Sequence, residues 1–195
     1  MNGNTFVFFG IVGSGKGTQV KLLTDFLKAK DGKETVYGGT GEGFRKLVDS
    51  QSYTGDLLRD KMNKGELIAD FFANSIIANI LSEQITAEKN LILDGYPRTE
   101  EQSKVFKSMM KFFQRENIKI IYIQLSETEA MKRNLLRGRS DDTEAGLRKR
   151  FDEYTNNVIP AMNYFKGETG YTIYTINGEK SIEEVHQDII KALGY

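Results

Sequence analysis

The chain has 195 residues, no cysteine and a single histidine, and its 27 basic residues balance its 27 acidic residues. This length is typical of one globular domain. The missing cysteine excludes disulfides, thiolate zinc sites and cysteine nucleophiles, and the lone His186 argues against a histidine-based triad. Zero net charge disfavours nucleic acid as a partner. Any chemistry must therefore rest on lysine, arginine, carboxylates, hydroxyls and backbone amides.

The sequence shows no feature typical of a membrane or exported protein. Its longest apolar runs, residues 6–9 and 120–123, have the length of a strand and are far too short to span a bilayer. The first residues lack the cationic stretch that precedes the apolar run of a signal peptide. We therefore expect a cytoplasmic, monomeric protein with no membrane partner and no nucleic-acid partner.

Apolar runs and helical periodicities alternate along the chain. The predicted strands are residues 5–9, 34–37, 90–93, 119–124 and 171–176. The predicted helices are residues 17–30, 66–85, 99–115, 127–136, 143–164 and 181–193. Such alternation predicts an α/β fold, with a five-stranded parallel sheet between two layers of helices.

Two polar stretches interrupt this alternation. Residues 38–65 are rich in glycine, with short helical patterns at 44–48 and 57–62, and residues 137–146 form a second polar segment. Excursions from the core commonly close over a substrate.

A glycine-rich turn links the first predicted strand to the first predicted helix. Residues 10–19 read G-I-V-G-S-G-K-G-T-Q and satisfy the phosphate-binding pattern G-x-x-x-x-G-K. Glycines let successive backbone amides face anionic oxygens, and the helix N-terminus adds its dipole. A chance turn with a surface lysine is the alternative, which the strand–loop–helix context disfavours. The predicted ATP-binding residues here are Gly13, Ser14, Gly15, Lys16, Gly17 and Thr18, with Lys16 on the β- and γ-phosphates.

The third predicted strand ends in an acid followed by a turn. Residues 90–99 read N-L-I-L-D-G-Y-P-R-T, which places Asp94 at the carboxyl end of a parallel strand, beside the phosphate loop. An aspartate there can orient Mg²⁺, whereas a helix-capping role is the alternative. Thr18 is a second candidate for the metal, because Gly17 stands where Ser or Thr usually ligates Mg²⁺.

These two segments resemble one family. The form G-x-x-G-x-G-K-G-T-Q is similar to that of the nucleoside monophosphate kinases, the adenylate kinase family in particular, and D-G-Y-P-R-T is a signature of the same family. The resemblance implies that Gly95 and Arg98 hold the acceptor phosphate and that Gln102 reads the acceptor base. A primary amide matches the amino group and ring nitrogen of adenine, whereas an exposed helix residue is the alternative reading of Gln102.

The family's acceptor motif T-G-[DE]-x-x-R occurs twice, at residues 40–45 and 54–59. The second copy matches better by letters, but the first directly follows a predicted strand, as the family's motif does. We therefore choose Thr40 and Arg45 and interpret residues 54–59 as the start of a helix. The following K-G-E-L-I run resembles the segment over the acceptor base, which implies Glu66, Leu67 and Ile68. Gly43 is unusual in this motif, and the segment is faintly similar to thymidylate kinases. Acceptor nucleotides with a base other than adenine therefore remain alternatives.

Residues 132–150 carry seven basic and three acidic side chains. A solvated helix face is the usual meaning of such a run. Here R-G-R-S-D-D at 137–142, with Arg150 eleven residues after Arg139, resembles the family's lid. The resemblance implies that Arg137 packs on the donor nucleotide, that Arg139 and Arg150 clamp the phosphates, and that Asp141 and Asp142 hold a very short lid without zinc. Lys180 lies where the family's backbone meets the donor adenine.

The resemblance thus implies one adenylate-kinase-like domain over residues 1–195, with an acceptor insertion at about 39–70 and a lid at about 137–146. Its reaction would be Mg²⁺-dependent transfer, ATP + AMP ⇌ 2 ADP, by Lys16, Asp94, Arg98, Arg137, Arg139 and Arg150. A UMP/CMP or thymidylate-type kinase is one alternative. A non-catalytic nucleotide-binding protein or GTP switch is another, although the chain lacks the N-K-x-D motif of such switches.

Overall fold

The computed structural model describes residues 3–63, 68–138 and 142–195. Its centre is a parallel sheet in the order β2-β3-β1-β4-β5. The strands are β1 (Thr5–Gly10), β2 (Thr35–Gly39), β3 (Asn90–Asp94), β4 (Ile118–Gln124) and β5 (Tyr171–Asn177). All five predicted strands are confirmed within two residues at each end. No helix in the described ranges combines the length and apolarity needed to cross a membrane.

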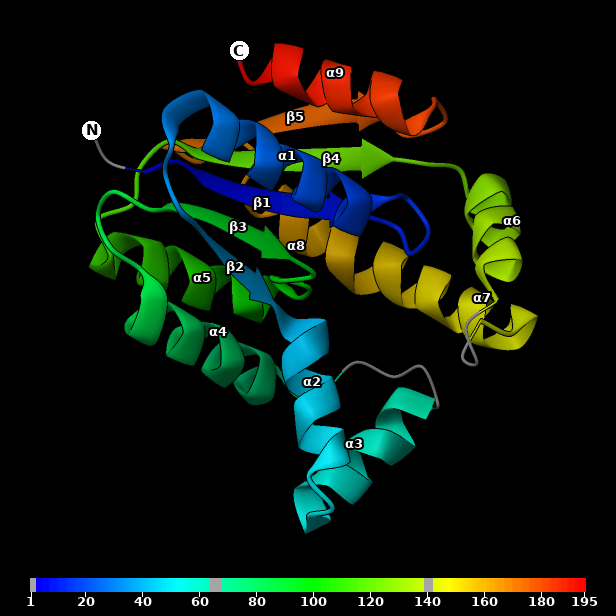
Figure 1. The fold of residues 1–195 in the computed structure, drawn as a ribbon. Coiled ribbons are helices and arrows are strands. Elements are labelled where there is room, and N and C mark those ends of the chain that lie inside the picture. The colour runs from blue at the N-terminus through cyan, green and yellow to red at the C-terminus, as the bar shows by residue number, and fades with distance from the viewer. Residues whose placement is uncertain (1–2, 64–67, 139–141) are drawn as a thin grey trace.

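Helices cover both faces of the sheet (Figure 1). Helices α1 (Lys16–Asp31) and α9 (Ile182–Ala192) lie on one face; α4 (Asp70–Gln84), α5 (Glu100–Phe112) and α8 (Ile159–Asn163) lie on the other. Because side chains alternate along a strand, Phe6 and Phe8 of β1 pack toward α1 and α9, whereas Val7 and Phe9 pack toward α4, α5 and α8. The predicted three-layer α/β/α fold is confirmed.

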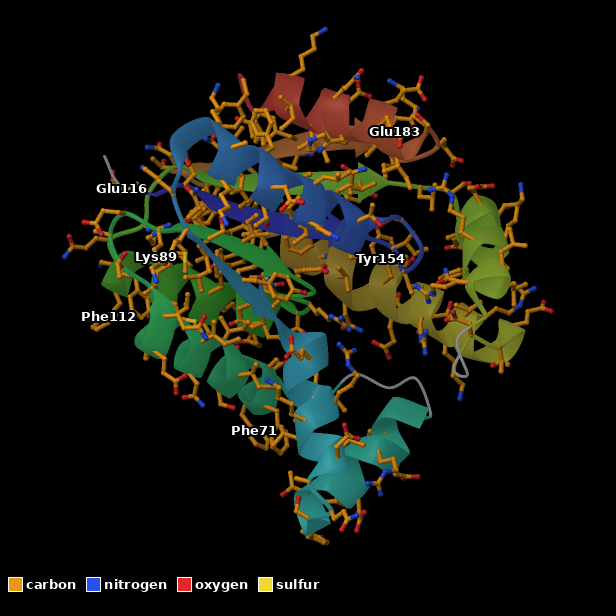
Figure 2. All side chains as sticks on the ribbon, in the orientation of Figure 1. Phe71, Lys89, Phe112, Glu116, Tyr154 and Glu183 are labelled. Carbon is orange, nitrogen blue, oxygen red and sulfur yellow. The ribbon has the colours of Figure 1, made fainter. Side chains whose placement is uncertain are left out.

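Four more helices extend from the carboxyl end of the sheet. Helices α2 (Thr40–Asp49) and α3 (Tyr53–Asn63) project from β2, and α6 (Glu127–Arg137) and α7 (Glu144–Glu153) follow β4 (Figure 1). A small apolar cluster joins α6 and α7 to the sheet through Ile11, Leu125, Ala130, Leu147 and Phe151. Exposed aromatic side chains lie elsewhere: Phe71 and Phe112 point outward, away from the three layers (Figure 2).

The predicted helix over residues 143–164 is interrupted. Between α7 and α8 lies a π-helix, η1 (Tyr154–Val158). Pro160 follows it at the start of α8 and has no N–H to donate to the carbonyl four residues earlier. A wider π turn accommodates that missing bond.

Among the other predicted boundaries that differ from the structure, two lie at the ends of the polar excursion. The helix predicted at 66–85 begins only at Asp70, with residues 66–67 outside the described ranges. The polar excursion predicted from residue 38 begins later, because Gly38 and Gly39 extend β2. A Cβ on Gly38 would lie 2.3 Å from Cδ2 of Leu93, so glycine allows the sheet to continue there.

A buried arginine ties together the amino end of the sheet. Arg115 follows α5, and the residue is 6% exposed. It donates from Nε to Thr5 Oγ1 (3.0 Å) and from Nη2 to the carbonyls of Asn4 (3.0 Å) and Lys89 (2.8 Å). Burial lowers the pKa of this guanidinium, and one hydroxyl and several backbone carbonyls, rather than a carboxylate, accept from its donors in the described residues. One side chain therefore links β1, the start of β3 and the end of α5.

We expect Arg115→Met to lower the free energy of unfolding by about 3 kcal/mol, because several buried carbonyls lose a charged donor. Urea denaturation with comparison of m-values would measure it. The matched control is Arg148→Met, whose exposed guanidinium pairs with Glu144 one helical turn away and whose loss should cost at most about 0.5 kcal/mol. Equal stability of the two variants would contradict this role for Arg115.

Candidate nucleotide-binding site

The carboxyl ends of β1 and its neighbours open into one cleft. Strand β1 lies between β3 and β4, where the chain order along the sheet reverses, and ligands of open parallel sheets bind at such points. The cleft has a volume of about 830 Å³. Its walls come from the loop after β1, the starts of α1 and α2, the turn after β3, and helices α6, α7 and η1.

The loop between β1 and α1 has the backbone conformation of an anion cradle. Gly13 (φ +88°) and Gly15 (φ +86°) adopt the left-handed region, which side chains other than glycine rarely enter. Gly15 is also the N-cap of α1 and provides no side-chain cap, so the N–H groups of the first turn have no capping side chain. Those donors and the helix dipole suit a phosphate group.

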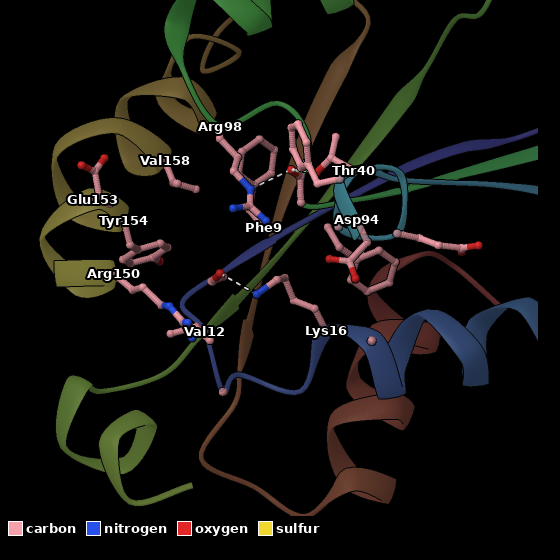
Figure 3. Close-up of a pocket in the computed structure, with 18 of the residues that line it drawn as sticks. Phe9, Val12, Lys16, Thr40, Asp94, Arg98, Arg150, Glu153, Tyr154 and Val158 are labelled. Carbon is pink, nitrogen blue, oxygen red and sulfur yellow. Dashed lines mark hydrogen bonds between the residues drawn. The ribbon is translucent and has the colours of Figure 1, made fainter. Parts of the chain in front are cut away.

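Lys16 projects from the first residue of α1 into this cradle. Its Nζ donates to the carbonyls of Gly10 (2.8 Å) and Ile11 (3.0 Å) (Figure 3). Burial lowers the pKa of Lys16 to about 8; nearby Asp94 opposes this shift and Arg98 adds to it. A phosphate group would therefore meet a lysine that is desolvated and already aimed into the loop.

We expect nucleotide binding to take up a proton at about pH 9. Lys16 is then mostly neutral in the free protein, since its pKa is about 8, and phosphate charge favours the protonated form. Calorimetry of ADP binding in buffers of different ionisation enthalpy would measure the uptake. The uptake should shrink toward pH 7, where Lys16 is already charged, and disappear in Lys16→Met. The same uptake in that variant would contradict this explanation.

The turn after β3 supplies a second cation that lines the cleft. Arg98 donates from Nε to the carbonyl of Gly95 (2.8 Å), and desolvation lowers the pKa of its guanidinium. Gly95 has φ +73°, and a Cβ there would lie 2.8 Å from Nη2 of Arg98. In Figure 3, Arg98, Arg150 and Lys16 point toward the same space from three different elements, with Asp94 beside it.

Gln102 is held by its side-chain amide rather than exposed on the helix. The residue is 3% exposed and lines the cleft. Its Oε1 accepts from the backbone N–H of Arg98 (2.8 Å), and its Nε2 donates to Oδ1 of Asp70 (2.7 Å). The alternative of an exposed helix residue is therefore wrong. One amide hydrogen and one lone pair remain for a ligand.

The two copies of the T-G-[DE]-x-x-R motif lie in different environments. Thr40 lines the cleft and donates from Oγ1 to the carbonyl of Gly95 (3.1 Å), and Arg45 also lines the cleft. In the second copy, Arg59 pairs with Asp56 (2.7 Å), and neither residue is on the cleft wall. A Cβ on Gly55 would lie 2.7 Å from the carbonyl oxygen of Leu47. The glycine of the second copy therefore allows α3 to pack closely on α2.

Gly43, which is unusual for the motif, has a packing role. A Cβ there would lie 2.7 Å from Cγ2 of Ile76 on α4, so glycine lets α2 approach α4. Farther along, Ile68 lines the cleft. Glu66 and Leu67 lie outside the described residues.

One buried carboxylate organises the arginines on the opposite wall. The Asp142 side chain is fully buried and bonds to Arg137 Nη2 (2.8 Å) and Arg150 Nη1 (3.3 Å). Both arginines line the cleft. Arg139 and Asp141 lie outside the described residues. Asp142 thus spans the α6–α7 connection and fixes two guanidinium groups.

Arg133 and Tyr37 are among the cleft-lining residues to which the sequence interpretation gave no role. Arg133 lines the cleft, and its guanidinium is fixed by Glu129 Oε1 (2.8 Å) and the carbonyl of Gly178 (3.0 Å). Its spacing of one helical turn from Arg137 was a pattern that could have revealed it. Tyr37 also lines the cleft; its pKa is raised by burial and by Asp94.

Two predicted donor residues are not on the cleft wall. The Ser14 side chain is buried beneath the loop. Lys180 pairs with Asp188 of α9 (2.6 Å). The remaining predicted loop residues, Gly13, Gly15, Gly17 and Thr18, do line the cleft.

The cleft has an excess of positive charge that suits polyphosphates. Its described cationic residues are Lys16, Arg45, Arg98, Arg133, Arg137 and Arg150, against the acidic Glu42, Asp94 and Glu153. Asp94 Oδ1 is buried and has no hydrogen-bond partner among the described residues. That free carboxylate oxygen fits a water molecule bound to Mg²⁺, the hard cation that accompanies nucleotide phosphates.

A phosphate loop at the switch point of a parallel sheet, facing arginines from several elements, defines a P-loop phosphotransferase. A family model described as adenylate kinase matches residues 8–170. An adenylate kinase of Prochlorococcus marinus (strain MIT 9301) is 32% identical over 183 residues, covering 94% of each chain. One from Corynebacterium urealyticum is 32% identical over 188 residues, covering 96% of this chain and 97% of the relative. The chain belongs to the adenylate kinase family.

Proposed function

We propose that this cleft transfers the terminal phosphoryl group of ATP to AMP, reversibly and with Mg²⁺, to give two molecules of ADP. The observation that carries the proposal is the convergence of Lys16, Arg98 and Arg150 on one space beside Asp94 (Figure 3). Family membership and the full-length relatives support the same reaction.

The donor nucleotide would lie against the phosphate loop. Backbone amides of residues 13–18 bind its phosphates, and Lys16 exchanges its two carbonyl acceptors for phosphate oxygens. Arg133, whose guanidinium plane is fixed at the cleft wall, would lie beside the donor nucleoside. Mg²⁺ would neutralise phosphate charge, while Asp94 and the hydroxyl of Thr18 orient its water ligands.

The acceptor would lie between α2, the turn after β3 and the start of α5. Arg45 and Arg98 bind its phosphate, and the remaining amide hydrogen and lone pair of Gln102 read its base. Thr40, Gly95 and Ile68 also line this part of the cleft. Glu66 and Leu67 are proposed for the same subsite on the resemblance alone.

The transfer needs orientation and charge stabilisation rather than a general base, because the acceptor phosphate is already ionised. Arg137 and Arg150 would hold the transferring group, and forked guanidinium donors match its equatorial oxygens. Asp142 keeps these two arginines in place before the substrates arrive. Arg139 is proposed to join them. Closure of the insertion at about 39–70 and the lid at about 137–146 would exclude water, which competes as acceptor.

The direct test is an assay of ADP formation from Mg-ATP with AMP, UMP, CMP and dTMP as separate acceptors. AMP should be the preferred acceptor by at least about 10²-fold in kcat/KM, as a hydrogen-bonding base pocket discriminates. Preference for a pyrimidine would replace the proposal by a UMP/CMP or thymidylate-type activity. Nucleotide binding without turnover of any acceptor would instead favour a non-catalytic protein.

A further inference from the structure

A buried asparagine connects the phosphate loop to α6. Asn134 is 0% exposed, although it is a polar residue in the interior of a helix. Its Nδ2 donates to the carbonyl of Val12 in the loop (3.0 Å) and to that of Ala130, one turn earlier in α6 (2.7 Å). Asparagine disfavours helix interiors, so this position calls for an explanation other than helix formation.

The contact is specific in orientation and in shape. Two carbonyl oxygens face the amide, so the NH₂ group must point at them, and the reversed orientation would place three oxygens together. A Cβ on Gly13 would lie 2.3 Å from Nδ2 of Asn134. The asparagine therefore fills the space that a side chain at the next loop position would need.

Stability alone does not account for this residue. Asn134 Oδ1 is buried and has no hydrogen-bond partner in the described part of the chain. Burying an acceptor without a partner is destabilising, so the two hydrogen bonds made by Nδ2 come with a cost. The amide is thus kept at a buried position where one of its two polar atoms is unsatisfied.

The neighbours of Asn134 indicate what that bond achieves. Arg133 precedes it, and Arg137 lies one turn later on α6; both line the cleft, whereas Asn134 does not. Its bond to Val12 therefore joins the helix that carries these arginines to the loop that faces the same cleft. Backbone donors and guanidinium groups stabilise phosphate charge well only when their relative positions are fixed in advance.

We propose that Asn134 is a positioning residue for the donor nucleotide. It fixes the Val12–Gly13 segment and joins the phosphate loop, Arg133 and Arg137 into one rigid donor-binding unit. The inference deepens the proposed function and assigns Asn134 to donor binding, with no direct contact to either substrate.

The test uses Asn134→Leu, which removes the donor, and Asn134→Asp, which keeps the shape but turns oxygens toward both carbonyls. We expect the KM for ATP and the Kd of a non-hydrolysable ATP analogue to rise about fivefold in Asn134→Leu, because one hydrogen bond to the loop is lost. Both constants should rise further in Asn134→Asp, because a carboxylate oxygen then faces the two carbonyls. The KM for AMP should change by less than about twofold. The urea midpoint of Asn134→Leu should fall, because leucine is larger than asparagine and leaves the carbonyl of Val12 without its donor, so the selective change in ATP affinity is the deciding readout.

Asn90→Leu is the matched control. Asn90 is also 0% exposed, and its Oδ1 accepts from the backbone N–H of Asn4 (2.8 Å). Its buried Nδ2 has no hydrogen-bond partner in the described part of the chain. Unlike Asn134, it lies at the amino end of β3, away from the cleft wall. Its substitution should leave ATP binding unchanged. Unchanged analogue affinity in both Asn134 variants, or equal changes for ATP and AMP, would overturn the proposal. Because analogue binding does not require turnover, this result is independent of whether the proposed reaction holds.

Discussion

Arg98→Ala is expected to reduce kcat/KM for AMP by about 10³-fold, an effect of the size seen when one positioned charge is removed from a phosphoryl-transfer site. The guanidinium is anchored through Nε to the carbonyl of Gly95 and points into the space shared with Lys16 and Arg150 (Figure 3). Steady-state kinetics with AMP as the varied substrate would measure the loss.

Two control variants separate charge from geometry and from folding. Arg98→Lys keeps a positive charge but loses the planar fork that carries the bond to Gly95, so it should recover only a small part of the activity. Arg148→Ala removes an exposed arginine of α7 that is not on the cleft wall, and it should leave the kinetics unchanged. Near-normal turnover by Arg98→Ala would refute the assignment of this residue.

Lys16→Met should lower kcat by about 10³-fold with little change in fold, since methionine has a similar length and removes only the ammonium group. In the free protein this ammonium bonds to two loop carbonyls and is desolvated, which lowers its pKa to about 8. Its charge is therefore available to phosphates without the cost of first losing bulk water. Single-turnover measurements would separate the loss in transfer from any loss in ATP binding.

The control for this variant is Lys21→Met, which removes an exposed lysine from the same helix, away from the cleft wall. It should match the wild type in rate and in urea midpoint. If Lys16→Met retained wild-type turnover, the loop would bind nucleotide in some other way and the proposed chemistry would fail.

Much of this protein is predictable from local patterns in its sequence. Buried parallel strands are continuous apolar runs, so residues 5–9 and 119–124 indicate their own structure, and alternation with helices predicts that the strands are parallel. The phosphate loop is predictable for a similar reason: its glycines, Lys16 and the following helix are contiguous, so their geometry depends on a few neighbouring residues.

Other features depend on contacts between distant segments, which no local pattern contains. Pro160 widens a helix that periodicity alone extends without interruption. Gln102 is buried because Asp70, thirty-two positions away, accepts from its amide.

The α/β class, the phosphate loop and the chemistry available to a chain without cysteine and with one histidine can be predicted from the sequence, because these are properties of contiguous residues and of composition. The contacts of Asp142 with Arg137 and Arg150, and the bond from Asn134 to the carbonyl of Val12, are known only from the folded structure. Such contacts form when helices pack against the sheet, and packing depends on the whole core rather than on any one segment.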